Sequence, residues 1–196
     1  MRKPLALLLM LALLTCPAAL AEEEFIDLGF IRWRACENDM VQVNEKADGQ
    51  VLAYVYPDFR PEDAFHTHWQ VVWHSEVIAM PEDLEDFAAA AMDSAIQDFA
   101  GPILTVSNPR LVDYSIQDDL PAIMLTYQAD VDYAALADFA ATLYFNQLIY
   151  PMEGDGTYSV TVISDSEFIS TMRALEIAVA CAAQRTGALD GLFDAK

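Results

Sequence analysis

The three histidines are the residues of this chain whose type and spacing most directly suggest chemistry. His66, His68 and His74 all lie in the ten-residue segment FHTHWQVVWH. A neutral imidazole can bind a divalent metal ion, and it also takes up a proton near pH 6.5. On an extended strand, His66 and His68 point to the same side about 7 Å apart, so their rings can converge on one ion. His74 lies about 20 Å from His68 along a straight strand, which is too far to join them.

A metal site built on this pair needs further ligands, and the nearest carboxylates precede it in the loop PDFRPED. The first hypothesis is therefore a divalent-metal site of Glu62, Asp63, His66 and His68, serving metal binding or a metal-dependent hydrolase. The second is a solvated strand face that binds nothing. The third is a surface whose charge changes when histidines among carboxylates take up protons. The residues alone leave the three alternatives open.

Three pairs of carboxylates could also bind a cation or act as acid and base, but turns explain their positions better. The carboxylate pairs Asp118 with Asp119, Asp130 with Asp132, and Glu153 with Asp155 lack the calcium-loop pattern and stand beside expected strand ends. The chain also lacks the G-x-S-x-G, H-E-x-x-H, phosphate-loop and G-x-G-x-x-G patterns. These observations favour a non-enzymatic protein with no cofactor, apart from the metal of the first hypothesis.

The N-terminus predicts export. Two basic residues precede an apolar run over residues 5–14, and small residues lead to a cleavage site between Ala21 and Glu22. The run is shorter than the roughly 20 residues that a membrane-spanning helix needs. We therefore expect a signal peptide over residues 1–21 and one periplasmic or secreted domain over residues 22–196, without a transmembrane segment. Lipidation of Cys16 is the alternative.

The net charge limits the classes of partner that we expect, and the cysteine count bears on the compartment. The chain has 31 acidic and 10 basic residues, a formal net charge of −21, which disfavours nucleic acid and acidic membranes as partners. The expected partner is an extracytoplasmic protein or a small ligand. After signal cleavage two cysteines remain, and an oxidising compartment favours a Cys36–Cys181 disulfide. Closing so long a loop stabilises a protein by at most about 5 kcal/mol, and two buried thiols are the alternative.

Apolar spacing predicts strands interrupted by two helices. Residues 40–44 and 50–56 form a hairpin around Asp48-Gly49, and period-two alternation makes a half-buried strand of the histidine segment, with the histidines on its wetter face. Four further strands are expected over residues 103–112, 122–129, 141–150 and 157–163, the first broken at Asn108-Pro109. The stretch 130–141 is ambiguous between a short helix and an irregular connection.

Both expected helices are amphipathic. The first has Pro81 at its first position, a stop at Gly101-Pro102, and an apolar stripe of Leu84, Phe87, Ala88, Ala91, Ala95 and Phe99. The second starts at a capping box of Ser164 and Glu167 and ends at Gly187. Its expected buried stripe is Phe168, Met172, Leu175 and Val179. The element order predicts an α+β fold in which a mostly antiparallel sheet is packed by two amphipathic helices.

Several segments carry a resemblance to a known family. They are LGFIRW, MPEDLEDFA, DDLPAIMLTYQ, and GTYSVTVIS followed by DSEFISTMRAL. In this order, over roughly residues 28–185, the chain resembles the family that includes the extrinsic PsbP protein of photosystem II and the bacterial periplasmic protein DcrB. The resemblance implies an α-β-α sandwich and a role as an accessory or binding module without catalysis. We therefore predict an exported, non-enzymatic binding module, with a metal-dependent protein using His66 and His68 as the alternative.

Overall fold

A seven-stranded antiparallel sheet forms the centre of the fold, with strand order β3-β4-β5-β9-β8-β7-β6. The computed structural model describes residues 25–28, 30–63, 65–100, 104–117, 122–132 and 140–185. Two short strands, β1 and β2, pair with each other in a separate sheet. The strands are β1 (Phe25–Asp27), β2 (Arg32–Arg34), β3 (Met40–Val43), β4 (Gln50–Tyr56), β5 (His68–His74), β6 (Thr105–Gln117), β7 (Ala122–Asp132), β8 (Ala140–Met152) and β9 (Gly156–Ser164).

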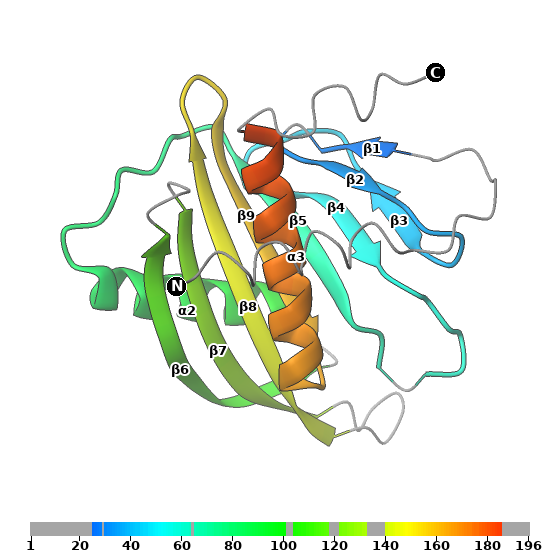
Figure 1. Cartoon of the computed structure of the whole chain (residues 1–196). Helices are drawn as coiled ribbons and strands as arrows, with labels where there is room; N and C mark the ends of the chain where they lie inside the picture. Colours follow the sequence, from blue (N-terminus) through cyan, green and yellow to red (C-terminus); the bar gives the residue numbers. More distant parts are fainter. Residues whose placement is uncertain are drawn as a thin grey trace, which may run out of the picture.

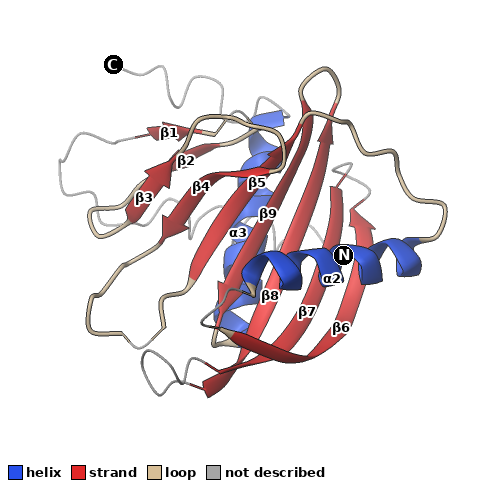
Figure 2. Ribbon diagram, turned by 180° about the vertical axis from the view of Figure 1, so that it is seen from behind, coloured by secondary structure: helices blue, strands red, loops and turns tan. Residues whose placement is uncertain are grey.

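The two described helices lie on opposite faces of this sheet. Helix α3 (Glu167–Arg185) is in front of the sheet in Figure 1, and helix α2 (Leu84–Phe99) is in front in the reversed view of Figure 2. The expected α+β class, with a large antiparallel sheet and two helices, is confirmed. The predicted signal segment 1–21, the Ala21–Glu22 cleavage site, Cys16, Gly101-Pro102, Asp118-Asp119 and Gly187 lie outside the described residues, as does most of the ambiguous stretch, residues 133–139.

The order of the strands explains which distant segments become neighbours. Strands β3, β4 and β5 form one antiparallel series, and β6 to β9 form a second one that starts at the far edge of the sheet. Because the second series runs back toward the first, its last strand β9 lies beside β5. The register pairs His68 with Ile163 and His74 with Thr157. The residues before β5 and those after β9 therefore meet at one end of the sheet.

Helix α2 and its face of the sheet form one hydrophobic core, largely as predicted. Ala88, Met92 and Ile96 of the helix are buried against the sheet, and the predicted Leu84, Phe87, Ala91, Ala95 and Phe99 pack around them. The sheet contributes large residues such as Tyr127 and Phe145, whose rings stack at 5.0 Å. Burying large apolar side chains of this kind contributes about 2 kcal/mol each, so this face stabilises the fold strongly.

The predicted buried stripe of helix α3 is wrong. Phe168 at its start is 74 % exposed, and the helix instead buries a stripe two residues further on. Both stripes repeat with steps of four, three and four residues, so periodicity alone could not choose between them. Small side chains decide the outcome, because they let the helix approach a face already filled by residues such as Tyr150 and Tyr158. The buried stripe consists of Ser170, Ala174, Ile177 and Cys181.

Both helices also begin later than expected. Asp83, not Pro81, caps helix α2, where its carboxylate accepts hydrogen bonds from the backbone N–H groups of Glu85 and Asp86. Ser166 stands at the start of α3, and its hydroxyl accepts from the N–H of Ile169 at 3.4 Å. The predicted cap, Ser164, is instead the last residue of strand β9, where its backbone pairs with Tyr144 of β8. Strand pairing therefore removed Ser164 from the capping role.

Strand β6 forms one edge of the sheet and is irregular in two places. Asn108-Pro109 does not end the strand, which continues from Thr105 to Gln117, but the register with β7 shifts between Ser107 and Arg110. A second shift falls between Leu111 and Asp113, and Asn108 has a φ of 51°. Each shift places an extra residue in the outer strand, which is the geometry of a β-bulge.

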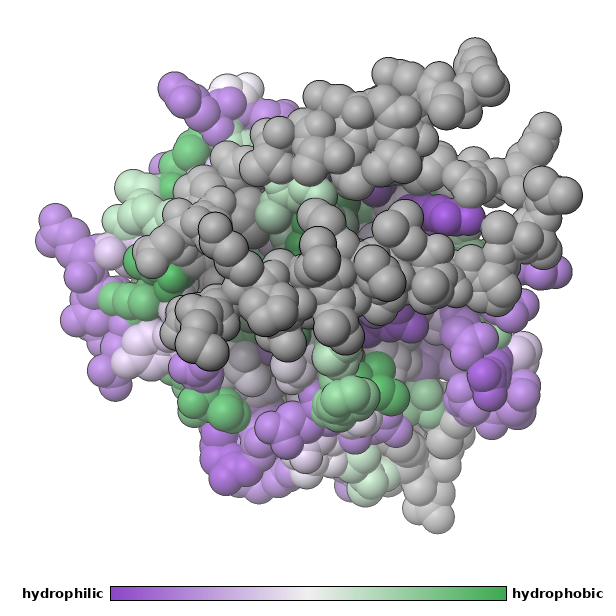
Figure 3. All heavy atoms as spheres, in the orientation of Figure 1, coloured by the Kyte–Doolittle hydropathy of each residue, from purple (hydrophilic) through white to green (hydrophobic). Residues whose placement is uncertain are grey.

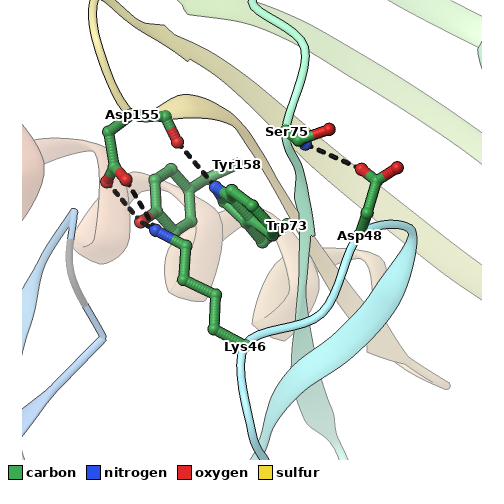
Figure 4. Close-up of polar contacts among 6 residues, drawn as sticks. All are labelled: Lys46, Asp48, Trp73, Ser75, Asp155 and Tyr158. Atoms are coloured by element: carbon green, nitrogen blue, oxygen red, sulfur yellow. Dashed lines mark hydrogen bonds and ion pairs between the residues drawn. The ribbon is translucent and has the colours of Figure 1, made fainter.

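A compact polar network joins the β3–β4 turn to the β8–β9 hairpin (Figure 4). The Lys46 ammonium donates to Asp155 at 2.6 Å and to the Tyr158 hydroxyl at 2.7 Å, and it lies 4.4 Å from the centre of the Trp73 ring. Tyr158 and the Trp73 indole also donate to Asp155, at 2.6 and 2.7 Å. Asp155 is therefore the centre of a network, where the sequence suggested only a solvated turn.

We expect Lys46→Met to lower the free energy of unfolding by about 1 kcal/mol at pH 7, as for a partly exposed charged hydrogen bond. The hydrogen bond from Lys46 lowers the pKa of Asp155. The stabilisation is therefore present above the ordinary carboxyl pKa and is lost as the pH falls through the lowered one. Urea unfolding checks this, with Arg32→Met as the control, since Arg32 and Asp27 form only an exposed pair at 3.8 Å. Equal effects of the two changes would contradict the prediction.

The two cysteines occupy different environments. Cys36 is exposed after strand β2, and Cys181 is buried in the α3 core. The backbone N–H of Arg32 donates to Gln184 at 2.7 Å, so β2 lies beside the last turn of α3. The Cys36–Cys181 disulfide stays a prediction, and titrating thiols in the unfolded, unreduced protein distinguishes one bond from two thiols.

Candidate functional site

A cleft opens where the loop before β5 meets the start of helix α3. The pairing of His68 with Ile163 places the described residues before β5, 57–63 and 65–67, beside the segment that follows β9 (Figure 1). The hydroxyls of Thr67 and Ser164 are 2.8 Å apart and join the two segments at this point. The cleft has a volume of about 370 Å³, within the range of small-ligand sites. Its lining residues are Pro57, Asp58, Phe59, Arg60, Asp63, Phe65, His66, Thr67, Asp165, Ile169 and Arg173.

Opposite charges share this lining. Three carboxylates, those of Asp58, Asp63 and Asp165, stand with the guanidinium groups of Arg60 and Arg173. The molecule as a whole is strongly acidic, with a net charge of −21. Hydrophilic residues lie along much of the rim of the face seen in Figure 3. The cleft therefore offers cationic groups in a protein that has few of them.

Each guanidinium already has one carboxylate partner. Arg60 donates to Asp58 at 2.7 Å, and this hydrogen bond raises the pKa of Arg60 above its ordinary value. Arg173 donates to Glu176, one turn along helix α3, also at 2.7 Å. A guanidinium carries five N–H donors, so one contact leaves most of its capacity unused.

Aromatic rings pack against one another where the loop meets the start of strand β5. The Phe59 and His66 rings are 4.4 Å apart, and the Tyr56 and His68 rings stack at 4.9 Å. Phe65 lies 6.0 Å from His68 on another side. The packed rings hold the loop against the end of the sheet, so the polar groups of the cleft stand on a supported surface.

The predicted exposed position of His68 is wrong. Its side chain is only 9 % exposed, because the rings of Tyr56 and Phe65 pack against it on the face expected to be wet. Burial lowers the pKa of His68, so the imidazole is neutral at pH 7. Its Nδ1 lies 2.8 Å from the backbone oxygen of His66. His68 therefore supports the loop from within the core, whereas His66 reaches the cleft.

The structure unites half of the predicted metal ligands. Asp63 and His66 both line the cleft, whereas Glu62 and His68 are not among its lining residues. Across the described parts of the chain, no three His, Cys, Asp or Glu side chains are grouped closely enough to hold a metal ion. His74 stands at the opposite end of β5.

Of the other predicted carboxylate pairs, Glu153 and Asp155 lie in a turn as expected, whereas Asp130 and Asp132 do not. Asp130 and Asp132 are part of strand β7, and the Asp130 carboxylate accepts hydrogen bonds from Asn108 and Thr142. These two bonds lower the pKa of Asp130. The Asp130 carboxylate therefore links strand β7 to its two neighbours in the sheet.

Sequence reasoning missed Arg60, Asp165 and Arg173 as members of one site. Arg173 lies more than a hundred residues from Arg60 in the chain, and only the β5–β9 pairing brings their segments together. A signal was nevertheless present: basic residues are scarce here, and two of the seven in the described ranges line this cleft.

No helix in the described ranges is long and apolar enough to cross a membrane. Comparison with models of protein families and with curated proteins finds no match to the chain. The resemblance to the PsbP and DcrB family therefore stays a prediction.

Proposed function

We propose that this chain is an exported, non-enzymatic module that binds an extracytoplasmic protein or small ligand in the cleft between residues 57–67 and helix α3. The observation that carries the proposal is the cleft itself, in which polar groups with unused hydrogen-bonding capacity stand beside apolar rings. Small-ligand sites combine these two kinds of surface. Export follows from the predicted signal peptide, and the α-β-α arrangement agrees with the accessory role that the family resemblance implies.

The environment of the histidines favours binding over catalysis. A nucleophilic enzyme places its base within hydrogen-bond reach of a serine, threonine or cysteine. Within the described residues, His68 contacts a backbone oxygen through Nδ1 and the His66 ring packs on Phe59. The cleft hydroxyl of Thr67 is paired with Ser164 instead.

Metal binding is a second candidate, because Asp63 and His66 line one cleft. Carboxylate oxygen and imidazole nitrogen are ligands that zinc accepts. If the cleft binds zinc or copper, His66→Ala weakens binding, whereas His68→Ala leaves the ligand set intact. Isothermal titration with each metal decides, and an affinity weaker than micromolar ends this candidate.

The main test is to isolate the protein from its own envelope or culture fluid. The full-length gene is expressed there, and mass spectrometry identifies the N-terminus, any small molecules released on denaturation, and bound metal. We expect an N-terminus at Glu22 and a bound species that is lost from the Arg60→Gln/Arg173→Gln variant. Arg110→Gln, on the distant strand β6, removes a positive charge without touching the cleft and serves as control. Retention of the species by the double variant, or no bound species at all, would refute the proposal.

A further inference from the structure

We propose that the ligand of the cleft is a short peptide or amino acid that carries both a free amino group and a free carboxylate, together with an apolar side chain. This inference rests on the proposed binding function and goes further by naming the chemical class. It follows from three kinds of group that line the same 370 Å³ cleft: guanidinium donors, carboxylates and apolar surface.

The ligand carboxylate is assigned to the two arginines. Arg60 stands on the loop wall and Arg173 on the helix wall, so their groups enter the cleft from two sides. Each has one carboxylate contact in the described structure, to Asp58 and Glu176 respectively. A guanidinium can hold a carboxylate through two parallel N–H donors, which gives both strength and orientation.

The ligand ammonium is assigned to Asp63 and Asp165. Both side chains line the cleft. Neither carboxylate accepts a side-chain hydrogen bond within the described residues, although Asp63 lies close enough to Arg60 to help raise the pKa of that guanidinium. Asp63 is on the loop and Asp165 just precedes helix α3, so the two acceptors come from different segments of the chain. An ammonium group has three donors and can bridge such a pair.

The charge balance of the cleft decides between an anion and a zwitterion. At physiological salt the screening length is about 8 Å, so groups in the cleft outweigh the distant carboxylates. The lining holds three carboxylates against two guanidiniums. A simple anion would meet a net negative site on a protein of charge −21, whereas a zwitterion satisfies both signs and has no net charge to be repelled.

The apolar residues of the cleft indicate that the rest of the ligand is an apolar side chain. Phe59 and Phe65 contribute from the loop and Ile169 from the helix, next to the charged groups. An apolar side chain of the ligand removes this surface from water, at about 25 cal/mol per Å². A volume of this size suits a ligand of one or two residues better than a long segment.

The test uses three forms of one dipeptide, alanyl-phenylalanine: free, N-acetylated and C-amidated. Isothermal titration of the exported protein at about 0.15 M salt is expected to detect the free form, with binding at least tenfold weaker after either capping. Arg173→Gln is expected to weaken the free dipeptide about tenfold while leaving the amidated form nearly unaffected. Asp165→Asn is expected to act in the complementary way, against the free form but not the acetylated one. Arg110→Gln is the control, and circular dichroism confirms folding of every variant.

The outcomes separate this inference from the function on which it rests. Equal binding of the capped and free forms overturns the zwitterionic class while leaving the cleft as a binding site. No binding of any form also overturns the class, and the species recovered with the isolated protein then decides the proposed function independently. Weaker binding of the free dipeptide to Arg110→Gln than to Arg173→Gln would place the site elsewhere and refute both.

Discussion

Gly156→Ala is expected to lower the free energy of unfolding by at least about 3 kcal/mol. Gly156 has a φ of +98°, a conformation that costs a non-glycine residue about 1–3 kcal/mol. An added Cβ would also clash with the backbone oxygen of His74 and lie 3.0 Å from the indole nitrogen of Trp73. Neither neighbour can move cheaply, because the backbone pairs with β9 and the indole donates to Asp155.

Gly154→Ala provides the matched control for this change. Gly154 lies in the same hairpin with a φ of +82°, and a Cβ there would meet nothing within 4 Å. We expect it to cost about 1–2 kcal/mol, from the backbone strain alone. Urea unfolding of both variants, followed by circular dichroism, measures the difference. If the two losses are equal, the contact with β5 contributes nothing and the explanation fails.

Acid is expected to destabilise the protein through His68. In the unfolded chain His68 binds a proton near pH 6.5, whereas burial lowers its pKa in the folded protein. Between these two pKa values the unfolded state holds more protons, so stability falls as the pH decreases from 6.5 toward the lowered pKa. The loss is at most about 1.4 kcal/mol per pH unit for one proton.

Comparing the pH dependence of stability in wild type and in a His68 variant separates this effect from the titration of the many carboxylates. We expect the stability difference between wild type and His68→Phe to move in favour of the variant as the pH falls from 7.5 to 5.5, by no more than the one-proton limit. Phenylalanine keeps an aromatic ring against Tyr56 and cannot take up a proton. Parallel pH profiles of wild type and His68→Phe would show that the buried imidazole is not responsible.

Local patterns predicted the strands well because each pattern had one solution. The Asp48-Gly49 turn and the alternation around Val41 and Val71 predict one hairpin and one further strand, and both are present. The prediction of the buried face of helix α3 was wrong because its sequence carries two stripes with the same spacing. The choice depended on the sheet surface beneath Ala174, which the helix sequence does not contain.

The candidate site could not be predicted, because it depends on contact between distant segments. His68 alternates with Trp69 and so looked exposed, but the rings of Tyr56 and Phe65 cover its side of the strand. Arg60 and Arg173 looked like isolated surface charges until the β5–β9 pairing placed their segments together. Local spacing reports which side of an element faces inward, and it says little when both sides are covered.

The irregular outer strand β6 has a consequence for how these molecules behave when crowded. A long, regular border strand offers a row of backbone groups on which a neighbouring molecule can add its own strand. Here Pro109 has no N–H to offer, and the bulges beside it twist the backbone out of line. The regular pairing edge is interrupted at this point, so the protein can reach a high local concentration without adding neighbouring molecules strand by strand along β6.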